Sequence, residues 1–145
     1  GPRSYRRRVE MVGRTGLARG RFLTLVHPPA VVSPRASIGV GGLVYPFTMI
    51  GPGVRLGDHV TVLSHGSINH DVSIGDGSIL AAHVVLAGGV TVEEHCYLGA
   101  GARIRQGVRV GSGAMVGMGA VVLEDVAPGA TVAGNPARPL PGRPT

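Results

Sequence analysis

His70 is the residue of this chain whose sequence neighbours best suit proton transfer. It stands between an amide, Asn69, and a carboxylate, Asp71. A carboxylate beside an imidazole raises its basicity and helps to hold it in place, and a basic imidazole can accept a proton from an attacking amine or hydroxyl. The spacing alone leaves two interpretations open, a general base and an ordinary surface histidine.

The element that must position His70 is a six-residue repeat. Every sixth residue from Val32 to Val122 is Ile, Leu or Val, at sixteen positions in a row, and the residue four places after each is small. This period fits neither the helix period of 3.6 nor the strand period of two. It is typical of hexapeptide repeats, in which each unit supplies one short strand and one turn and three units form a triangular coil of a parallel β-helix.

The repeat also assigns positions to the cysteine and to other histidines. Cys96 falls in the column of small interior residues, so we expect it to pack in the core and not to act as a nucleophile. His65 and His83 occupy a corner position and are one coil apart, so we expect them to stack on adjacent coils. Two further histidines share this corner position, whereas His70 does not.

The composition favours one domain built on small residues. The chain has 145 residues, of which 25 are glycine and only 3% are aromatic, and its formal net charge is +6. All basic residues apart from histidine are arginine, and half of them precede the repeat. This distribution argues against a nucleic-acid interface and fits a phosphorylated small ligand such as coenzyme A or a nucleotide sugar.

The sequence has no signal peptide and no apolar segment of membrane-spanning length. We therefore expect a cytoplasmic protein that binds neither nucleic acid nor a membrane.

A zinc site is the main alternative for the histidines. His65 and His70 are five residues apart, and the segment from Ser64 to Asp76 is similar to that of the γ-class carbonic anhydrases, zinc hydratases with the same prism. Zinc needs a third protein ligand, which in those enzymes comes from about one coil earlier. Residues 45–49 contain no such ligand, so we expect no metal.

From about Phe22 onward the chain resembles the bacterial hexapeptide-repeat acyltransferases that acetylate amino sugars, in particular sialic acid O-acetyltransferases and UDP-4-amino-sugar N-acetyltransferases. The resemblance rests on Leu25-Val26-His27-Pro28, Ile68-Asn69-His70-Asp71 with Ile74-Gly75-Asp76, Leu86-Ala87-Gly88-Gly89-Val90, Leu98-Gly99-Ala100-Gly101-Ala102 and Val132-Ala133-Gly134-Asn135-Pro136-Ala137. It implies an all-β fold, a left-handed parallel β-helix with a short N-terminal helix and strand segment.

The resemblance also implies an acetyl-CoA-dependent reaction and its site. His70 would take the proton from an amine or hydroxyl of a sugar or nucleotide sugar, and Asp71 would increase its basicity. Acetyl-CoA would lie in a groove between subunits, with backbone groups at Ala100 and Met118 holding its pantetheine arm. Ile79 matches a further acetyl-CoA contact where relatives can carry histidine, and it can offer only its backbone and an apolar wall.

The resemblance divides the chain into three parts. Relatives carry a nucleotide-sugar-binding α/β domain before the β-helix, and residues 1–26 resemble only its last helix and strand, with helical character over residues 3–18 and a strand over residues 21–26. Residues 27–138 form the β-helical acyltransferase domain, with an unbroken register between Val32 and Ala127. For the proline-rich tail, residues 139–145, we expect no regular structure.

Apolar residues outside the interior columns predict an oligomer. Flat faces of parallel strands that carry such residues can bury them against a second copy, most simply in a closed homotrimer with parallel axes and sites between subunits. Two alternative functions stay open on the sequence, the zinc hydratase and a non-catalytic trimeric β-helix that serves as an oligomerisation platform.

Overall fold

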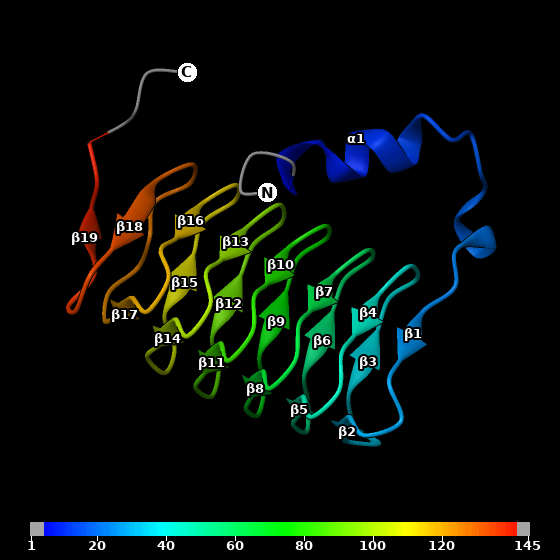
Figure 1. The fold of residues 1–145 in the computed structure, drawn as a ribbon, viewed down its shortest axis with the longest axis horizontal. Helices are drawn as coiled ribbons and strands as arrows, with labels where there is room; N and C mark the ends of the chain where they lie inside the picture. The colour runs from blue at the N-terminus through cyan, green and yellow to red at the C-terminus, as the bar shows by residue number, and fades with distance from the viewer. Residues whose placement is uncertain (1–4, 142–145) are drawn as a thin grey trace.

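The structure, a computed structural model, describes residues 5–141 and consists mainly of two-residue strands in three sheets (Figure 1). We call these sheets A, B and C, and they form the three sides of a prism. Strands that are one coil apart pair in parallel, with Leu80 opposite Leu98 in sheet A, for example. The prediction of a left-handed parallel β-helix built on hexapeptide repeats is confirmed.

Sheet A contains β1 (Leu25–Val26), β4 (Leu43–Val44), β7 (Thr61–Val62), β10 (Ile79–Leu80), β13 (Tyr97–Leu98), β16 (Met115–Val116), β18 (Thr131–Ala133) and β19 (Arg138–Pro139). Sheet B contains β2 (Val31–Val32), β5 (Met49–Ile50), β8 (Ser67–Ile68), β11 (Val85–Leu86), β14 (Arg103–Ile104) and β17 (Val121–Val122). Sheet C contains β3 (Ser37–Ile38), β6 (Arg55–Leu56), β9 (Ser73–Ile74), β12 (Thr91–Val92) and β15 (Arg109–Val110).

The two columns of the repeat form the core. Each interior aliphatic residue from Val44 to Val122 is buried, and so is each small residue from Gly42 to Val126. Val32 and Ile38 are half-buried, because no complete coil precedes the first one and covers them. The core is therefore a continuous apolar column that runs along the prism axis.

The coil register shortens at the C-terminal end. Val126 lies opposite Val110 and Thr131 lies opposite Met115, so both partners are sixteen residues apart. The expectation of an unbroken register to Ala127 is therefore wrong over its last residues. The next interior position would be Pro128, which has no backbone N–H to donate to a neighbouring strand.

The N-terminal segment is less regular than expected. A 3₁₀ turn (Tyr5–Arg7) leads into α1 (Arg8–Gly13), and a second 3₁₀ turn (Arg19–Arg21) precedes β1. The helix expected over residues 3–18 is thus shorter, because Gly13 and Gly16 disfavour its continuation. Residues 3 and 4 lie outside the described residues, and the strand expected over residues 21–26 is limited to β1.

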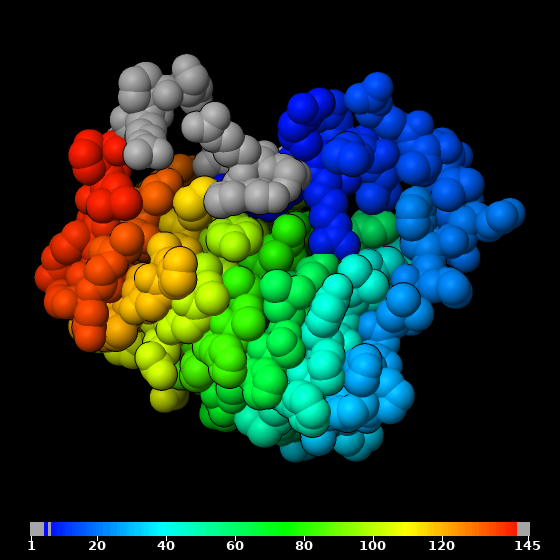
Figure 2. Space-filling model, in the orientation of Figure 1, coloured from blue at the N-terminus to red at the C-terminus, as the bar shows by residue number. Residues whose placement is uncertain are grey.

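This segment lies across the outer face of sheet A (Figures 1 and 2). Tyr5 is buried, and its ring centroid lies 5.6 Å from that of Tyr97. The guanidinium of Arg8 donates a hydrogen bond to the hydroxyl of Thr61. A six-residue helix is not stable alone, so contacts with sheet A hold it in place.

A salt bridge fastens the end of the same segment. Arg19 donates two hydrogen bonds to the Asp58 carboxylate, at 2.7 and 2.8 Å. This contact lowers the pKa of Asp58 below its usual value.

The C-terminal part contains one strand that the sequence did not predict. Ala133 lies opposite Arg138 in the antiparallel pair of β18 and β19. The expectation of no regular structure from residue 139 is therefore wrong at Pro139, and residues 142–145 of the tail lie outside the described part of the chain. Between residues 5 and 141 no helix combines the length and the apolar character that crossing a bilayer requires.

Cys96 packs in the core, as expected. Its side chain is fully buried, and its Sγ lies 3.2 Å from the carbonyl oxygen of Gly111. Burial raises the pKa of this thiol to about 11. At neutral pH the thiol is therefore protonated and shielded from reagents.

We expect the Cys96 thiol to react with DTNB only after unfolding. An exposed cysteine has a pKa of about 8.5 and reacts readily at pH 8. Burial in the native protein blocks the reagent from reaching Cys96 and keeps its thiol protonated. Absorbance should report no release of thionitrobenzoate from native protein, and one equivalent from protein unfolded in urea. Equal rates in the two states would show that Cys96 is accessible.

Candidate active site

The corners of the prism carry the polar side chains. Corner AB joins sheets A and B, and corners BC and CA are named in the same way. Every sixth residue from Gly41 to Gly119 lies at a corner with a φ between 55° and 72°. Eight of these residues are glycine and four are histidine, a residue that tolerates the left-handed conformation better than most.

His70 and Asp71 form a pair at corner BC, in the turn between β8 and β9. The Nδ1 atom of His70 lies 3.0 Å from the Oδ2 atom of Asp71, and the two side chains are 58% and 73% exposed. An ionised carboxylate can only accept hydrogen bonds, so Nδ1 is the donor and Nε2 keeps a lone pair. This arrangement leaves Nε2 able to accept a proton from a ligand.

Two glycines on the neighbouring coils make room for this pair. Gly88 lies one coil after His70, and a Cβ added there would overlap Cε1 and Nε2 of the imidazole. Gly53 lies one coil before Asp71, and a Cβ there would overlap the carboxylate. Sequence reasoning missed both roles, although the coil spacing aligns each glycine with its partner.

The main-chain contacts of the pair come from the same two coils. The N–H of Gly89 donates to the carbonyl oxygen of His70 at 2.9 Å, and the N–H of Asp71 donates to that of Pro52 at 2.9 Å. The backbone under both side chains is therefore fixed by the stacking of coils.

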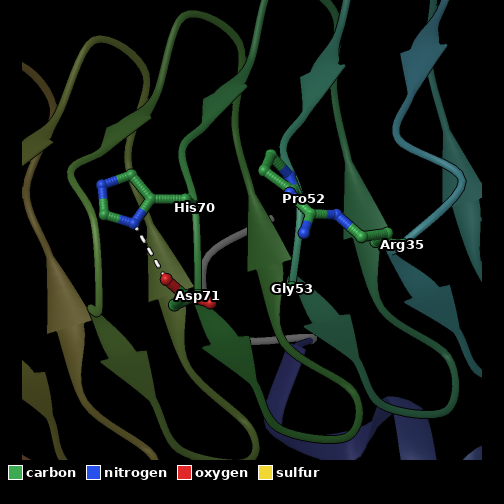
Figure 3. Close-up of a pocket in the computed structure, with 5 residues that line it drawn as sticks. All are labelled: Arg35, Pro52, Gly53, His70 and Asp71. Carbon is green, nitrogen blue, oxygen red and sulfur yellow. Dashed lines mark hydrogen bonds and ion pairs between the residues drawn. The ribbon is translucent and has the colours of Figure 1, made fainter.

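A hollow opens beside the pair (Figure 3). Arg35, Pro52, Gly53, His70 and Asp71 line it, and the Arg35 guanidinium points toward Pro52. Arg35 stands two coils before Asp71 in the same column, so the eighteen-residue spacing in the sequence indicates their proximity.

Ala100 and Met118 lie at corner AB, on two successive coils. The N–H of Gly119 donates to the carbonyl oxygen of Ala100 at 2.8 Å, and the Met118 side chain is 80% exposed. A Cβ added at Gly119 would meet no atom within 4 Å. This part of corner AB is thus a bare surface that can accept an extended ligand.

Ile79 lies on the outer face of sheet A, in β10. Leu80 points into the core, so the alternation of the strand turns Ile79 outward, where it is half-buried. Its neighbours in the sheet are Thr61 and Tyr97, and the N-terminal segment contacts both.

One chain brings only some of these residues together. His70 lies beside Asp71, and Ala100 lies beside Met118 on the next coil. Sheet B separates corner AB from corner BC, and sheet A is the side opposite corner BC. A site that contains all of them, with Ile79, therefore needs more than one copy of the chain.

Three of the other histidines, His59, His65 and His83, have ring contacts. His65 and His83 stack at corner AB, as expected, with ring centroids 4.7 Å apart, and Phe47 continues the stack. His65 and His70 lie at different corners of the prism. Among residues 5–141, no group of three His, Cys, Asp or Glu side chains could hold a metal ion.

Comparison with known proteins agrees with this architecture. The family described as "Hexapeptide repeat of succinyl-transferase" matches residues 89–124. No curated protein matches the sequence. The structure of a mutant of AntD, an N-acyltransferase from Bacillus cereus, has a TM-score of 0.75 at 17% identity, with 93% of this chain and 89% of that chain covered. This likeness concerns the fold alone.

Two solved structures are more similar in sequence. The acetyltransferase domain of PglB from Neisseria gonorrhoeae FA1090 is 36% identical, with a TM-score of 0.86 over 96% of this chain and 66% of that chain. PerB from Caulobacter crescentus, solved with CoA and GDP-perosamine, is 32% identical, with a TM-score of 0.89 over 95% of this chain and 67% of that chain. The chain thus spans about two thirds of the length of these relatives. Its sequence identity and its stacked coils together show that it belongs to the hexapeptide-repeat family of sugar acetyltransferases.

Proposed function

We propose that this chain is an acetyl-CoA-dependent acetyltransferase that acts on an amine or hydroxyl of a sugar or nucleotide sugar. The observation that carries the proposal is the exposed His70–Asp71 pair, held at a corner with Nε2 available. Structures of relatives support this choice of donor and acceptor, since PglB has been solved with acetyl coenzyme A and PerB with CoA and GDP-perosamine. Acetyl-CoA as donor fits a cytoplasmic location.

His70 acts as general base in this proposal. Nε2 takes the proton from the acceptor amine or hydroxyl while the nitrogen or oxygen attacks the thioester carbonyl carbon. The tetrahedral intermediate collapses with cleavage of the C–S bond, and the protonated imidazole returns the proton to the leaving sulfur. Asp71 keeps Nδ1 as a donor and stabilises the imidazolium that forms between these steps.

The acyl donor is proposed to lie along corner AB, with its pantetheine arm beside Ala100 and Met118. Backbone carbonyl and N–H groups of successive coils repeat along this corner, and the bare surface at Gly119 lets an extended chain approach them. Ile79 is half-buried between residues that the N-terminal segment contacts, and its exposed part supplies an apolar wall on the adjoining side of sheet A. No side-chain donor stands at Ile79, so any hydrogen bond to the acetyl group must come from elsewhere.

The separation of the His70–Asp71 pair from the proposed donor site at corner AB supports a homotrimer with sites between subunits. Corner BC of one protomer would supply the base, and corner AB with sheet A of the next would supply the donor site. Three identical prisms packed with parallel axes repeat this contact three times in a closed ring. Exposed apolar side chains at Phe47, Met49 and Met118 support such burial against a second copy.

The test of the reaction is release of the CoA thiol from acetyl-CoA across a panel of amino sugars and nucleotide sugars. Cys96 does not interfere with a thiol reagent in native protein, because it is buried. Acetyl-CoA is also expected to raise the melting temperature, since it binds the native state. If acetyl-CoA produces neither thiol release nor stabilisation, the non-catalytic β-helix remains as the function. Stoichiometric zinc in the purified protein would favour the hydratase.

Replacement of the proposed base, His70→Ala, should lower kcat by about a hundredfold or more, because general-base catalysis contributes about 10² to 10⁴. The oligomeric state and melting temperature should be unchanged, since the His70 side chain is exposed. Steady-state thiol release and light scattering check both.

The matched control is His27→Ala, which removes another exposed histidine, one that follows β1 of sheet A and does not lie at corner BC. It should keep wild-type kcat, and Asp71→Asn should fall between the two histidine variants. Activity above about a tenth of wild type in His70→Ala would be too high for a general base.

Gly88→Ala should lower kcat by about tenfold to a hundredfold, because its methyl group displaces the imidazole that lies over Gly88 and a misplaced group loses catalysis. Gly20→Ala is the control, since a Cβ there meets no atom within 4 Å. Both variants should fold, as neither glycine has a positive φ. Wild-type kcat in Gly88→Ala would show that the position of the ring does not matter for turnover.

A further inference from the structure

We infer that Arg35 binds an anionic group of the sugar acceptor, a phosphate or a carboxylate, in the hollow beside the His70–Asp71 pair. This inference rests on the proposed function, because it names the class of acceptor for that site. Nothing in the motifs that relate this chain to its family includes Arg35. Three features support it: the position of Arg35, its free guanidinium and the direction from which an acceptor can enter.

Arg35 shares a surface hollow with the proposed base. Pro52 and Gly53 form the floor, and the guanidinium points across it toward the corner that holds His70 (Figure 3). Gly53 has no side chain to fill this floor, and Asp71 closes the far side. An acceptor in the hollow would therefore touch the pair at one end and Arg35 at the other.

The Arg35 guanidinium has no hydrogen bond or ion pair to any residue from 5 to 141. Two other arginines of the prism are engaged, since Arg109 pairs with Glu93 and Arg55 donates to the hydroxyl of Ser73. A planar guanidinium with unused donors matches phosphate and carboxylate oxygens in a bidentate geometry. Arg35 is thus available for an anion that the protein itself does not supply.

The length of the hollow suits a sugar with one anionic substituent. The backbones at residues 35 and 71 are two coils apart, about 10 Å along the prism axis at the usual strand spacing, and the Arg35 side chain reaches into this interval (Figure 3). A hexose ring with its reactive group near His70 and a phosphate or carboxylate near Arg35 spans such a distance. A neutral monosaccharide would leave the guanidinium without a partner.

The two substrates would approach from opposite ends of the prism. The proposed donor positions Ala100 and Met118 belong to later coils than His70, and the imidazole edge with Nε2 lies over Gly88, also on a later coil. The earlier coils at corner BC are left for the acceptor, and they carry Arg35. This order lets both ligands be bound when the proton is transferred.

The kinetic test compares glucosamine, glucosamine 1-phosphate and muramic acid as acceptors for wild type, Arg35→Ala and Arg14→Ala. Arg14 is exposed and lies on the N-terminal segment, so its variant is a control with the same loss of charge. Wild type and Arg14→Ala should prefer an anionic acceptor by about tenfold in kcat/KM, the size of one charge-assisted contact. In Arg35→Ala this preference should vanish through KM, with kcat unchanged.

The two anionic acceptors distinguish the sources of the charge. Preference for glucosamine 1-phosphate identifies a phosphate site, and preference for muramic acid identifies a carboxylate site. An unchanged preference in Arg35→Ala would overturn the assignment of Arg35, and so would the absence of any preference for charge in wild type.

A binding measurement separates this inference from the proposed reaction. Pyrophosphate titrated into ¹⁵N-labelled protein should shift the amide signals of Gly53 and Asp71 in wild type and in Arg14→Ala, and leave them in place in Arg35→Ala. Such shifts without any acetyl transfer would sustain the anion site and refute the reaction. Equal shifts in all three proteins would refute the anion site at Arg35 even if acetyl transfer is found, and the absence of shifts in every protein would refute a phosphate site there.

Discussion

Parallel hydrogen bonding between residues one coil apart is the constraint on which this structure depends. Ile79 lies opposite Tyr97, eighteen residues later, its N–H donates to the carbonyl oxygen of Cys96 at 2.9 Å, and this pattern recurs along each sheet. Each residue therefore has its environment set by the residues eighteen places before and after it. Where the step falls to sixteen, beyond Val122, the regular coils end.

The same stacking gives the three corners different chemistry. Corner CA carries carboxylates that accept backbone N–H groups from the preceding coil, as Asp76 does from Asp58 at 2.8 Å. Corner AB begins with the stacked rings of Phe47, His65 and His83 and continues as bare backbone. Corner BC holds the His70–Asp71 pair. Because the corners of one prism point away from each other, chemistry that needs two corners needs two prisms.

The fit of the His70–Asp71 pair shows how a solenoid builds a precise site without loops. Glycine at positions 53 and 88 leaves space on both neighbouring coils, and main-chain hydrogen bonds hold the turn itself. A side chain at either position would displace one member of the pair. Positioning therefore depends on residues that are distant in the sequence and that have no functional group.

The sequence by itself determined the fold, the core and the neighbours of each position, because a six-residue period with aliphatic and small columns leaves one way to bury them. It also singled out His70 and Asp71, which are adjacent in the chain. Tertiary structure alone decided the length of the N-terminal helix, its place over sheet A and the pairing of β19, since these depend on contacts outside the repeat. It also decided that the Arg35 side chain turns into the hollow beside His70, because the period sets the column of a residue but not the direction of a long side chain.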